Sequence, residues 1–267
     1  MRKTVFITGA STGLGKASAR LFQSIGWNVI ATMRNPQYET ELTALENVSV
    51  LKLDVTDPEQ IKETVAAAIS MHTIDLVLNN AGYGLIGVLE ALSDEQITRQ
   101  LNTNLLGVIR LTKGFIPYFR ERKAGMFINI TSMFGLAGYP TCSVYAATKF
   151  AVDGFSESLA YELAHFGVKV KIVAPGGIQT DFAGRSMDGG LHGAYTELAD
   201  KVAAGYSEEN ISRFSTAEAV AAVIYAAATD NKNQLRYFAG EDAINLYHER
   251  ETFGAEIQYQ KIQAMFV

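Results

Sequence analysis

Short apolar segments alternate with longer helical patterns along almost the whole chain. The first is KTVFIT (3–8), and GLGKASARLFQSIG (13–26) follows it with small and apolar residues at helical spacing. Further strands are predicted over 28–33, 48–55, 74–82, 125–132, 168–176 and 234–240. Strands joined through helices run parallel, so the pattern predicts a single, doubly wound α/β sheet of about seven strands with helices on both faces.

One segment departs from this rhythm. Residues 181–214 are glycine-rich at first and helical later, and they follow the sixth predicted strand. We expect them to form a flap over the carboxyl edge of the sheet. Because no linker rich in Pro, Gly or Ser interrupts the sequence, we predict one domain over residues 1–267.

The composition argues against a nucleic-acid-binding protein, a membrane-spanning protein and a metal site. A formal net charge of −5 argues against a nucleic-acid surface, and no apolar run approaches the roughly 20 residues that span a bilayer. We see no signal peptide. The single cysteine, Cys142, and four scattered histidines lack metal-ligand spacing, so we expect no bound metal and a reducing, cytoplasmic location.

The sequence TGASTGLG (8–15) joins the first predicted strand to the first helix. Glycines allow a sharp turn and close approach of a ligand, and a helix start offers N–H groups and a positive dipole end to a phosphate. The position predicts a Rossmann-type dinucleotide site, although the spacing is TGxxxGxG rather than GxGxxG.

A second motif, YAATK, places Tyr145 and Lys149 four positions apart, on one face of a helix. A nearby cation favours a phenolate, so Lys149 is expected to lower the pKa of Tyr145. A phenol that exchanges protons near neutral pH can act as a general acid.

These two motifs together resemble the short-chain dehydrogenases/reductases. Three further segments match that family in the same order: NNAG (79–82), NTNLLG (102–107) and NITS (129–132), and PGGIQT (175–180) resembles its Pro-Gly motif. The resemblance implies Tyr145 as proton donor, Ser132 as hydrogen-bond donor to the same substrate oxygen, Lys149 on the nicotinamide ribose, and Asn104 holding a water. It thus implies the catalytic set Asn104, Ser132, Tyr145 and Lys149.

The resemblance also implies cofactor contacts from several loops at the carboxyl ends of strands. They comprise Gly9, Ser11, Thr12, Gly13, Leu14, Gly15, Arg34, Asp54, Val55, Asn80, Ala81, Gly82, Tyr145, Lys149, Pro175, Gly176, Ile178 and Thr180.

The residues after the second strand favour NADP(H) over NAD(H). An acidic residue there would accept from ribose hydroxyls, but Met33 carries no charge, and Arg34 can pair with a 2′-phosphate.

The predicted pocket wall is apolar and favours ketones, aldehydes or secondary alcohols without many polar groups. It comprises Tyr83, Leu85, Phe134, Leu136, Tyr139, Ile178, Phe182, Met187, Leu191 and Tyr195. The expected protein is an NADP-dependent oxidoreductase similar to the branch with 17β-hydroxysteroid and retinol dehydrogenases. The alternatives are a 3-oxoacyl-carrier-protein reductase and a non-catalytic NADP-binding redox sensor. The family also implies a homodimer or homotetramer through helices near 94–120 and 143–166.

Overall fold

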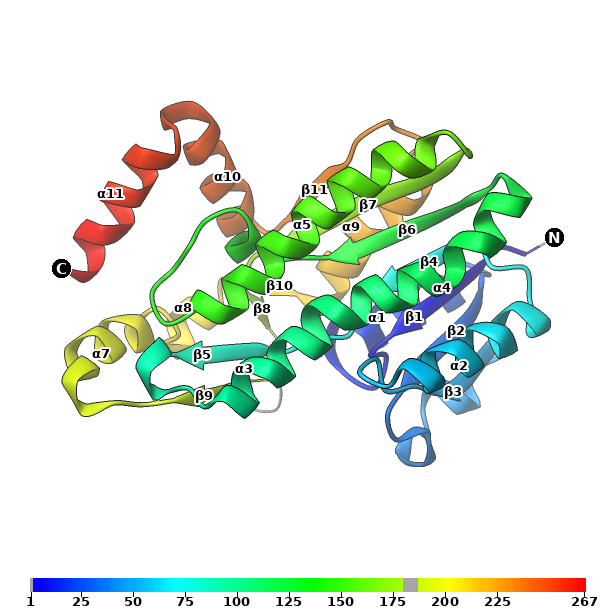
Figure 1. Cartoon of the computed structure of the whole chain (residues 1–267), viewed down its shortest axis with the longest axis horizontal. Helices are drawn as coiled ribbons and strands as arrows, with labels where there is room; N and C mark the ends of the chain where they lie inside the picture. Colours follow the sequence, from blue (N-terminus) through cyan, green and yellow to red (C-terminus); the bar gives the residue numbers. More distant parts are fainter. Residues whose placement is uncertain (1, 180–186) are drawn as a thin grey trace.

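The computed structural model describes residues 2–179 and 187–267. Seven parallel strands form the central sheet in the order β11-β7-β6-β4-β1-β2-β3 (Figure 1). They are β1 (Thr4–Thr8), β2 (Asn28–Met33), β3 (Val48–Lys52), β4 (Leu76–Asn79), β6 (Gly125–Ile130), β7 (Val168–Pro175) and β11 (Arg236–Ala239). This sheet confirms the predicted fold class. Strands β3, β4 and β6 end two or three residues before their predicted ends, and those residues enter the loops that carry the candidate site.

Helices cover both faces of the sheet. One face is covered by α1 (Gly13–Ser24) and α9 (Ala217–Thr229). The other face is covered by α2 (Pro58–Met71), α4 (Gly107–Arg122) and α5 (Ser143–Ala164). Their small and β-branched inner residues fit the pleated strands closely, and rings such as Phe22 and Trp27 pack edge to face at 4.9 Å. In the part of the chain that the structure describes, no helix combines the length and apolar character needed to cross a bilayer.

The strand order reverses between β1 and β4. The chain winds outward from β1 to β2 and β3, then returns to β4 and winds the other way. The connections after β1 and β4 therefore lead to helices on opposite faces of the sheet, and ligands of such sheets bind at the carboxyl edge at this point. The glycine turn follows β1 and the NNAG segment follows β4.

The flap is tied to the body of the protein by short strands. Strand β9 (Met187–Gly190) pairs with β5 (Gly84–Gly87), and β8 (Ile178–Gln179) pairs with β10 (Ser215–Thr216). The flap also contains α7 (Thr196–Ala204) and α8 (Glu208–Ile211). Asp188 accepts a hydrogen bond from Gln96 Nε2 at 2.8 Å and forms an ion pair with Arg99, so the flap is held against α3 (Asp94–Leu101).

Candidate active site

The glycine turn needs its glycines for steric reasons at two positions. Gly9 has a φ of +67°, and a Cβ there would lie 2.9 Å from the Ala81 Cα. A Cβ at Gly15 would lie 2.2 Å from the Gly9 carbonyl oxygen. The start of α1 can therefore approach both the turn and the loop after β4.

The first turn of α1 is open to a ligand. Thr12 occupies the N-cap position, but its side chain makes no capping hydrogen bond, whereas the Asp57 side chain caps α2 through two backbone N–H groups. Ser11 and Thr12 are exposed, and the first turn of α1 contains no acidic residue. Free N–H groups and a positive dipole end fit the pyrophosphate of a dinucleotide.

A buried hydroxyl joins the two loops that follow β1 and β4. Thr8 Oγ1 accepts hydrogen bonds from the backbone N–H groups of Asn80 at 3.0 Å and Ala81 at 2.9 Å. The Asn80 side chain donates in return to the carbonyls of Thr8 at 2.9 Å and Gly9 at 3.1 Å. Thr8 is not among the predicted site residues, although it stands at the end of β1 in the turn motif.

The residues expected around the adenosine lie at the ends of β2 and β3. Arg34 is exposed, whereas the Met33 side chain is 3% exposed and packs in the core. Asp54 Oδ1 accepts from the N–H and hydroxyl of Thr56 at 2.9 and 2.7 Å, so one carboxylate oxygen is engaged in a local turn. Val55 is buried against Gly107.

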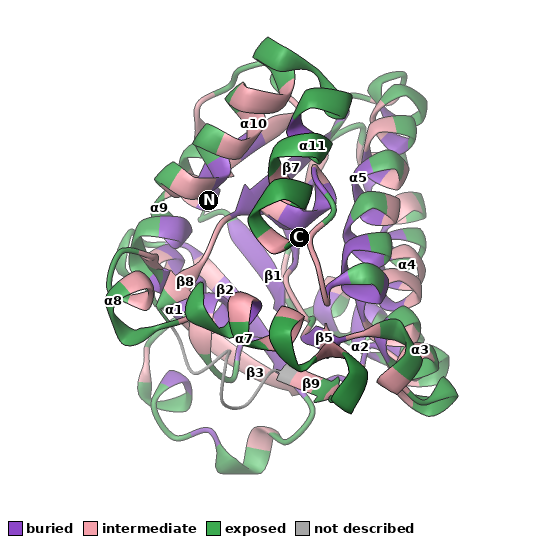
Figure 2. Cartoon of the chain, turned by 90° about the vertical axis from the view of Figure 1, so that its left-hand side faces the viewer, coloured by how far each residue is buried: buried purple, intermediate pink, exposed green. Residues whose placement is uncertain are grey.

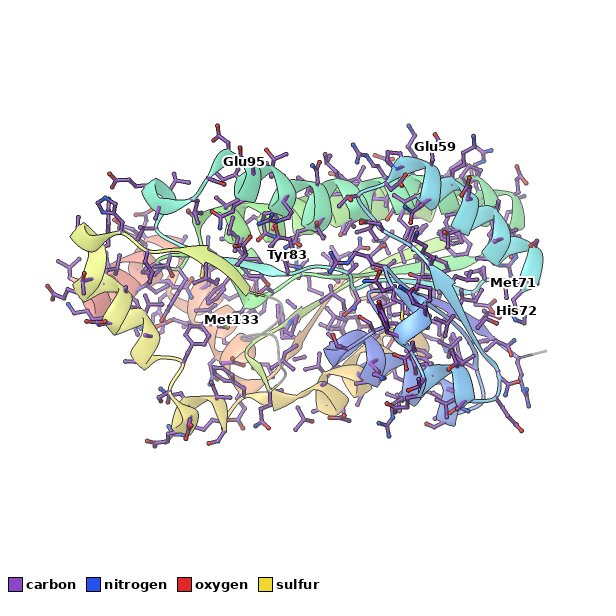
Figure 3. All side chains as sticks on the ribbon, turned by 90° about the horizontal axis from the view of Figure 1, so that it is seen from below. Glu59, Met71, His72, Tyr83, Glu95 and Met133 are labelled. Atoms are coloured by element: carbon purple, nitrogen blue, oxygen red, sulfur yellow. The ribbon has the colours of Figure 1, made fainter. Side chains whose placement is uncertain are left out.

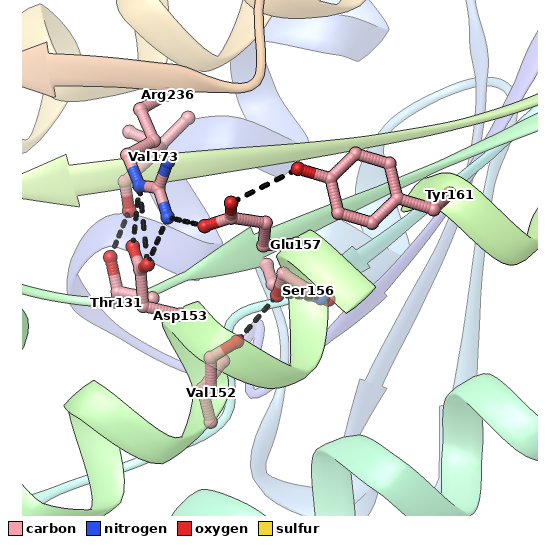
Figure 4. Close-up of polar contacts among 9 residues, drawn as sticks. Thr131, Val152, Asp153, Ser156, Glu157, Tyr161, Val173 and Arg236 are labelled. Carbon is pink, nitrogen blue, oxygen red and sulfur yellow. Dashed lines mark hydrogen bonds and ion pairs between the residues drawn. The ribbon is translucent and has the colours of Figure 1, made fainter. Parts of the chain in front are cut away.

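Two polar networks fix α5, the helix that carries Tyr145 and Lys149. Asn129 Oδ1 accepts from Asn79 Nδ2 at 2.7 Å, and Asn129 Nδ2 donates to Ser156 Oγ at 2.8 Å, which links β4, β6 and α5. Arg236 on β11 donates through Nε to both oxygens of Asp153 at 3.1 Å, and it also pairs with Glu157 (Figure 4). Hydrogen bonds of this charge-assisted kind are stronger than neutral ones.

Ser132, Tyr145 and Lys149 meet near the carboxyl end of β6. Lys149 Nζ donates to the Ile130 carbonyl at 3.0 Å, and Ser132 lies close enough to the phenol to lower its pKa slightly. Burial dominates, however, and raises the pKa of Tyr145 to about 12. Burial also lowers the pKa of Lys149 to about 8. The expectation that Lys149 lowers the Tyr145 pKa is therefore wrong for the protein on its own, because burial of the phenol sets the direction of the shift.

Asn104 lies in a π-helical segment, Asn102–Leu106, between α3 and α4. Its side chain is buried; Oδ1 accepts from the Tyr83 N–H at 3.1 Å, and Nδ2 donates to the Tyr83 carbonyl at 2.8 Å. Nδ2 also lies 3.5 Å from Thr148 Oγ1 on α5. Single π turns inside α-helices are frequent at functional sites, and the sequence pattern gave no sign of this one.

The Pro-Gly segment begins where β7 ends, at the carboxyl edge of the sheet. The Gly177 N–H donates to Asp242 Oδ2 at 2.6 Å, and Asp242 Oδ1 accepts from the Ala243 N–H at 2.9 Å. Asp242 lies in the first turn of α10 (Glu241–Phe253) and was absent from the predicted site. Pro175 ends β7 and Ile178 is half-buried in β8, whereas Thr180 lies outside the described residues.

Apolar and aromatic side chains pack around Tyr145 on the flap side. Tyr83 and Met133 lie toward the end of the molecule that carries the flap, and Met71 and His72 lie at the opposite end (Figure 3). The rings of Phe134 and Tyr139 stack at 5.0 Å.

The remaining wall predictions had mixed outcomes. Leu85 is fully buried in the protein interior, and Leu191 is 90% exposed, so the prediction that Leu191 lines the wall is wrong. Phe182 lies outside the described residues. Tyr206 was missed: burial raises its pKa, with smaller contributions from Cys142, Tyr139 and Tyr145, so its phenol lies near these groups.

Known proteins resemble this chain over most of its length. The short chain dehydrogenase family profile matches residues 3–189. Oxidoreductase BOA17 of Botryotinia fuckeliana is 35% identical over 249 residues, covering 91% of each chain. The 3-ketodihydrosphingosine reductase of Bacteroides thetaiotaomicron is 38% identical over 197 residues, covering 73% of this chain and 71% of the reductase. A solved structure of ElxO with NADP bound superposes with a TM-score of 0.78 at 30% identity, covering 92% of this chain and all of ElxO.

The matched segment contains the glycine turn, six of the seven strands of the sheet and the helix with Tyr145 and Lys149. Proteins of this kind bind a nicotinamide dinucleotide in the crevice at the carboxyl edge of the sheet. The chain therefore belongs to the short-chain dehydrogenase family and is an oxidoreductase that acts on CH–OH groups with NAD(P).

Proposed function

We propose that the protein is an NADP-dependent reductase of apolar ketones and aldehydes that also oxidises the corresponding alcohols. The observation that carries the proposal is the convergence of Ser132, Tyr145 and Lys149 at the carboxyl edge of the sheet, the edge that also carries the open start of α1. The ring of Phe134 packs against both Tyr145 and Tyr139 there. This edge thus joins a phosphate-binding end to a proton-donating end.

The chain's own residues supply the groups that a carbonyl reduction needs. NADPH, when bound, supplies the hydride that adds to the carbonyl carbon. Tyr145, neutral at pH 7 because its pKa is about 12, donates the proton to the oxygen, and Ser132 stabilises the negative charge that develops there. Lys149 uses one of its three N–H donors on Ile130, which leaves others for the ribose hydroxyls. Asn104 Oδ1 retains a lone pair for a water on the proton path.

Preference for NADP is proposed from Arg34. Its exposed guanidinium follows β2, where the adenosine ribose of such folds lies. A guanidinium pairs with phosphate through two parallel hydrogen bonds, which a plain ribose cannot accept in the same way. The NADP complex of the similar protein ElxO supports this choice.

The substrate class is proposed from the aromatic rings packed around Tyr145 and from the charges on the flap. Lys201 and Arg213 in the flap pair with Glu197 and Glu209. Because the charges of Lys201 and Arg213 are paired within the flap, they offer little attraction to an acidic carrier protein, the partner that a 3-oxoacyl reductase needs. An apolar substrate does not depend on such charges. The similar 3-ketodihydrosphingosine reductase, by its name, reduces a ketone.

A panel of ketones, aldehydes, steroids and retinoids, assayed by loss of NADPH absorbance, tests the proposal. Tyr145→Phe keeps the ring but removes the proton donor, so turnover of an accepted substrate should fall by about 10² or more. NADPH affinity should stay near the wild-type value. Turnover by the variant at the wild-type rate would refute the role of Tyr145, and NADPH binding without turnover of any compound would favour the redox-sensor alternative.

We also propose a homodimer or homotetramer formed through α4 and α5. Helix α5 exposes Phe150 by 41% and Tyr161 by 73%, and a second copy packed on this helix would cover both rings. Sedimentation equilibrium of the purified chain tests the assembly, and a monomer at micromolar concentration would contradict it.

A further inference from the structure

Helix α11 (Ala255–Phe266) reaches the candidate site through a series of aromatic contacts. The ring of Phe266 packs edge-on against Tyr139 with centroids 5.2 Å apart. Tyr139 stacks on Phe134 at 5.0 Å, and Phe134 meets the edge of Tyr145 at 6.5 Å. Four rings therefore connect α11 to the phenol that we propose as proton donor.

Specific hydrogen bonds hold α11 in this place. Gln258 is fully buried; its Nε2 donates to the Leu246 carbonyl of α10 at 2.8 Å, and its Oε1 accepts from Arg250 at 3.1 Å. At the other end, Lys201 Nζ of α7 donates to the Phe266 carbonyl at 3.3 Å. Figure 2, viewed toward the carboxyl edge of the sheet, shows α11 in front of the strands.

The two sides of α11 differ in exposure. Phe266 and Ile262, one turn apart, are half-buried, whereas Ile257, Tyr259 and Met265 are 45%, 58% and 63% exposed. The half-buried side is the one whose Phe266 ring contacts Tyr139.

We propose that α11 is the outer wall of the substrate pocket and that Phe266 is a specificity-determining residue that selects carbonyl compounds with a bulky apolar group. The inference rests on the proposed reductase function. A substrate whose carbonyl meets Tyr145 extends outward past Phe134 and Tyr139, so its distal part contacts the Phe266 ring. Removing that ring deprives a bulky substrate of an apolar partner and leaves a compact one unaffected.

The test compares Phe266→Ala with Met265→Ala, a neighbouring change on the exposed side. For a bulky apolar ketone, Phe266→Ala should raise KM by about tenfold with little change in kcat. A factor of this size is typical when an apolar pocket loses a contact with its substrate. For a compact ketone both variants should match wild type. Phe266→Leu should fall between wild type and Phe266→Ala, and it also serves if the alanine variant does not fold.

A second measurement works without turnover. Cys142 is the only cysteine, is 1% exposed, and packs with Phe134 and Tyr145. If α11 covers the pocket, dithiodipyridine should label Cys142 faster in Phe266→Ala than in wild type or Met265→Ala.

The outcomes separate the two proposals. If the KM for the bulky ketone is unchanged in Phe266→Ala, the proposal that α11 forms the pocket wall is wrong, whatever the rate of Cys142 labelling. If the wild-type protein reduces no carbonyl compound, the reductase function is rejected. Faster labelling of Cys142 in Phe266→Ala would then still support α11 as a cover of the pocket, and equal labelling would reject that proposal as well.

Discussion

The Lys149 ammonium lies 5.7 Å from the centre of the Tyr145 ring and donates its hydrogen bond to the backbone of Ile130. Both side chains are buried, and burial shifts their pKa values in opposite directions, to about 12 for Tyr145 and about 8 for Lys149. At pH 7 the free protein therefore holds a neutral phenol and a charged ammonium.

Cofactor affinity should depend on the charge of Lys149. Above pH 8 the free protein loses this proton, so if the ammonium binds the ribose hydroxyls, the NADPH dissociation constant should rise toward about tenfold per pH unit. Below pH 8 it should be constant down to pH 7. Binding titrations between pH 7 and 9.5 measure the NADPH dissociation constant. In Lys149→Met this constant should show no change of slope near pH 8. A flat wild-type curve would remove the ribose role.

Arg34→Ala should mainly erase the preference for NADPH. Charge-assisted hydrogen bonds to the 2′-phosphate are worth about 1.5–3 kcal/mol, which corresponds to roughly 10- to 150-fold in kcat/KM. Arg20→Ala, which removes another exposed arginine, on α1, that pairs with Glu41, is the control. A wild type that uses NADH as well as NADPH would leave Arg34 without this role.

Thr8→Val should destabilise the fold more than its size suggests. The change keeps the shape but leaves the N–H groups of the half-buried Asn80 and Ala81 without their acceptor, at a cost of about 2–4 kcal/mol in unfolding free energy. Thr32→Val on the neighbouring strand is the matched control, because it loses one donated bond to Ile7, worth about 1 kcal/mol. Urea denaturation compares them, and equal losses would contradict the bridging role.

Asp242→Ala should loosen the Pro-Gly segment. The carboxylate accepts from Gly177 and Ala243, so its loss should cost about 1–3 kcal/mol and weaken cofactor binding. Glu241→Ala, an exposed change in the same first turn of α10, should cost less than about 0.5 kcal/mol. Thermal denaturation with and without NADPH distinguishes the two, and similar shifts would show that only the helix dipole matters.

The sheet could be predicted from the sequence because each strand is a compact apolar run, and the site residues follow strand ends that the topology must bring together. Contacts between distant segments could not be predicted in this way. Strands β5 and β9 have four residues each, and four of the eight are glycines, so no alternating pattern marks them. The contact of Phe266 with Tyr139 has no local signal.

The pKa shifts of Tyr145 and Lys149 also could not be predicted from the sequence. Spacing places two side chains on one helix face but does not tell how deeply the sheet buries them or which carbonyl the ammonium meets. Thr8 and Asp242 were missed for a related reason, since each acts through backbone N–H groups of another segment.

The π-helical segment at Asn102–Leu106 has a consequence for the geometry of the two helices that it joins. An α-helix advances about 100° around its axis per residue, so one additional residue in a turn rotates everything beyond it by about that angle. Helix α3 can thereby face β5 and α5 while α4 faces α2 and β6. Deleting Thr103 would restore an unbroken α-helix, but it would swing Gln96 and Arg99 away from Asp188 and so separate the flap from α3.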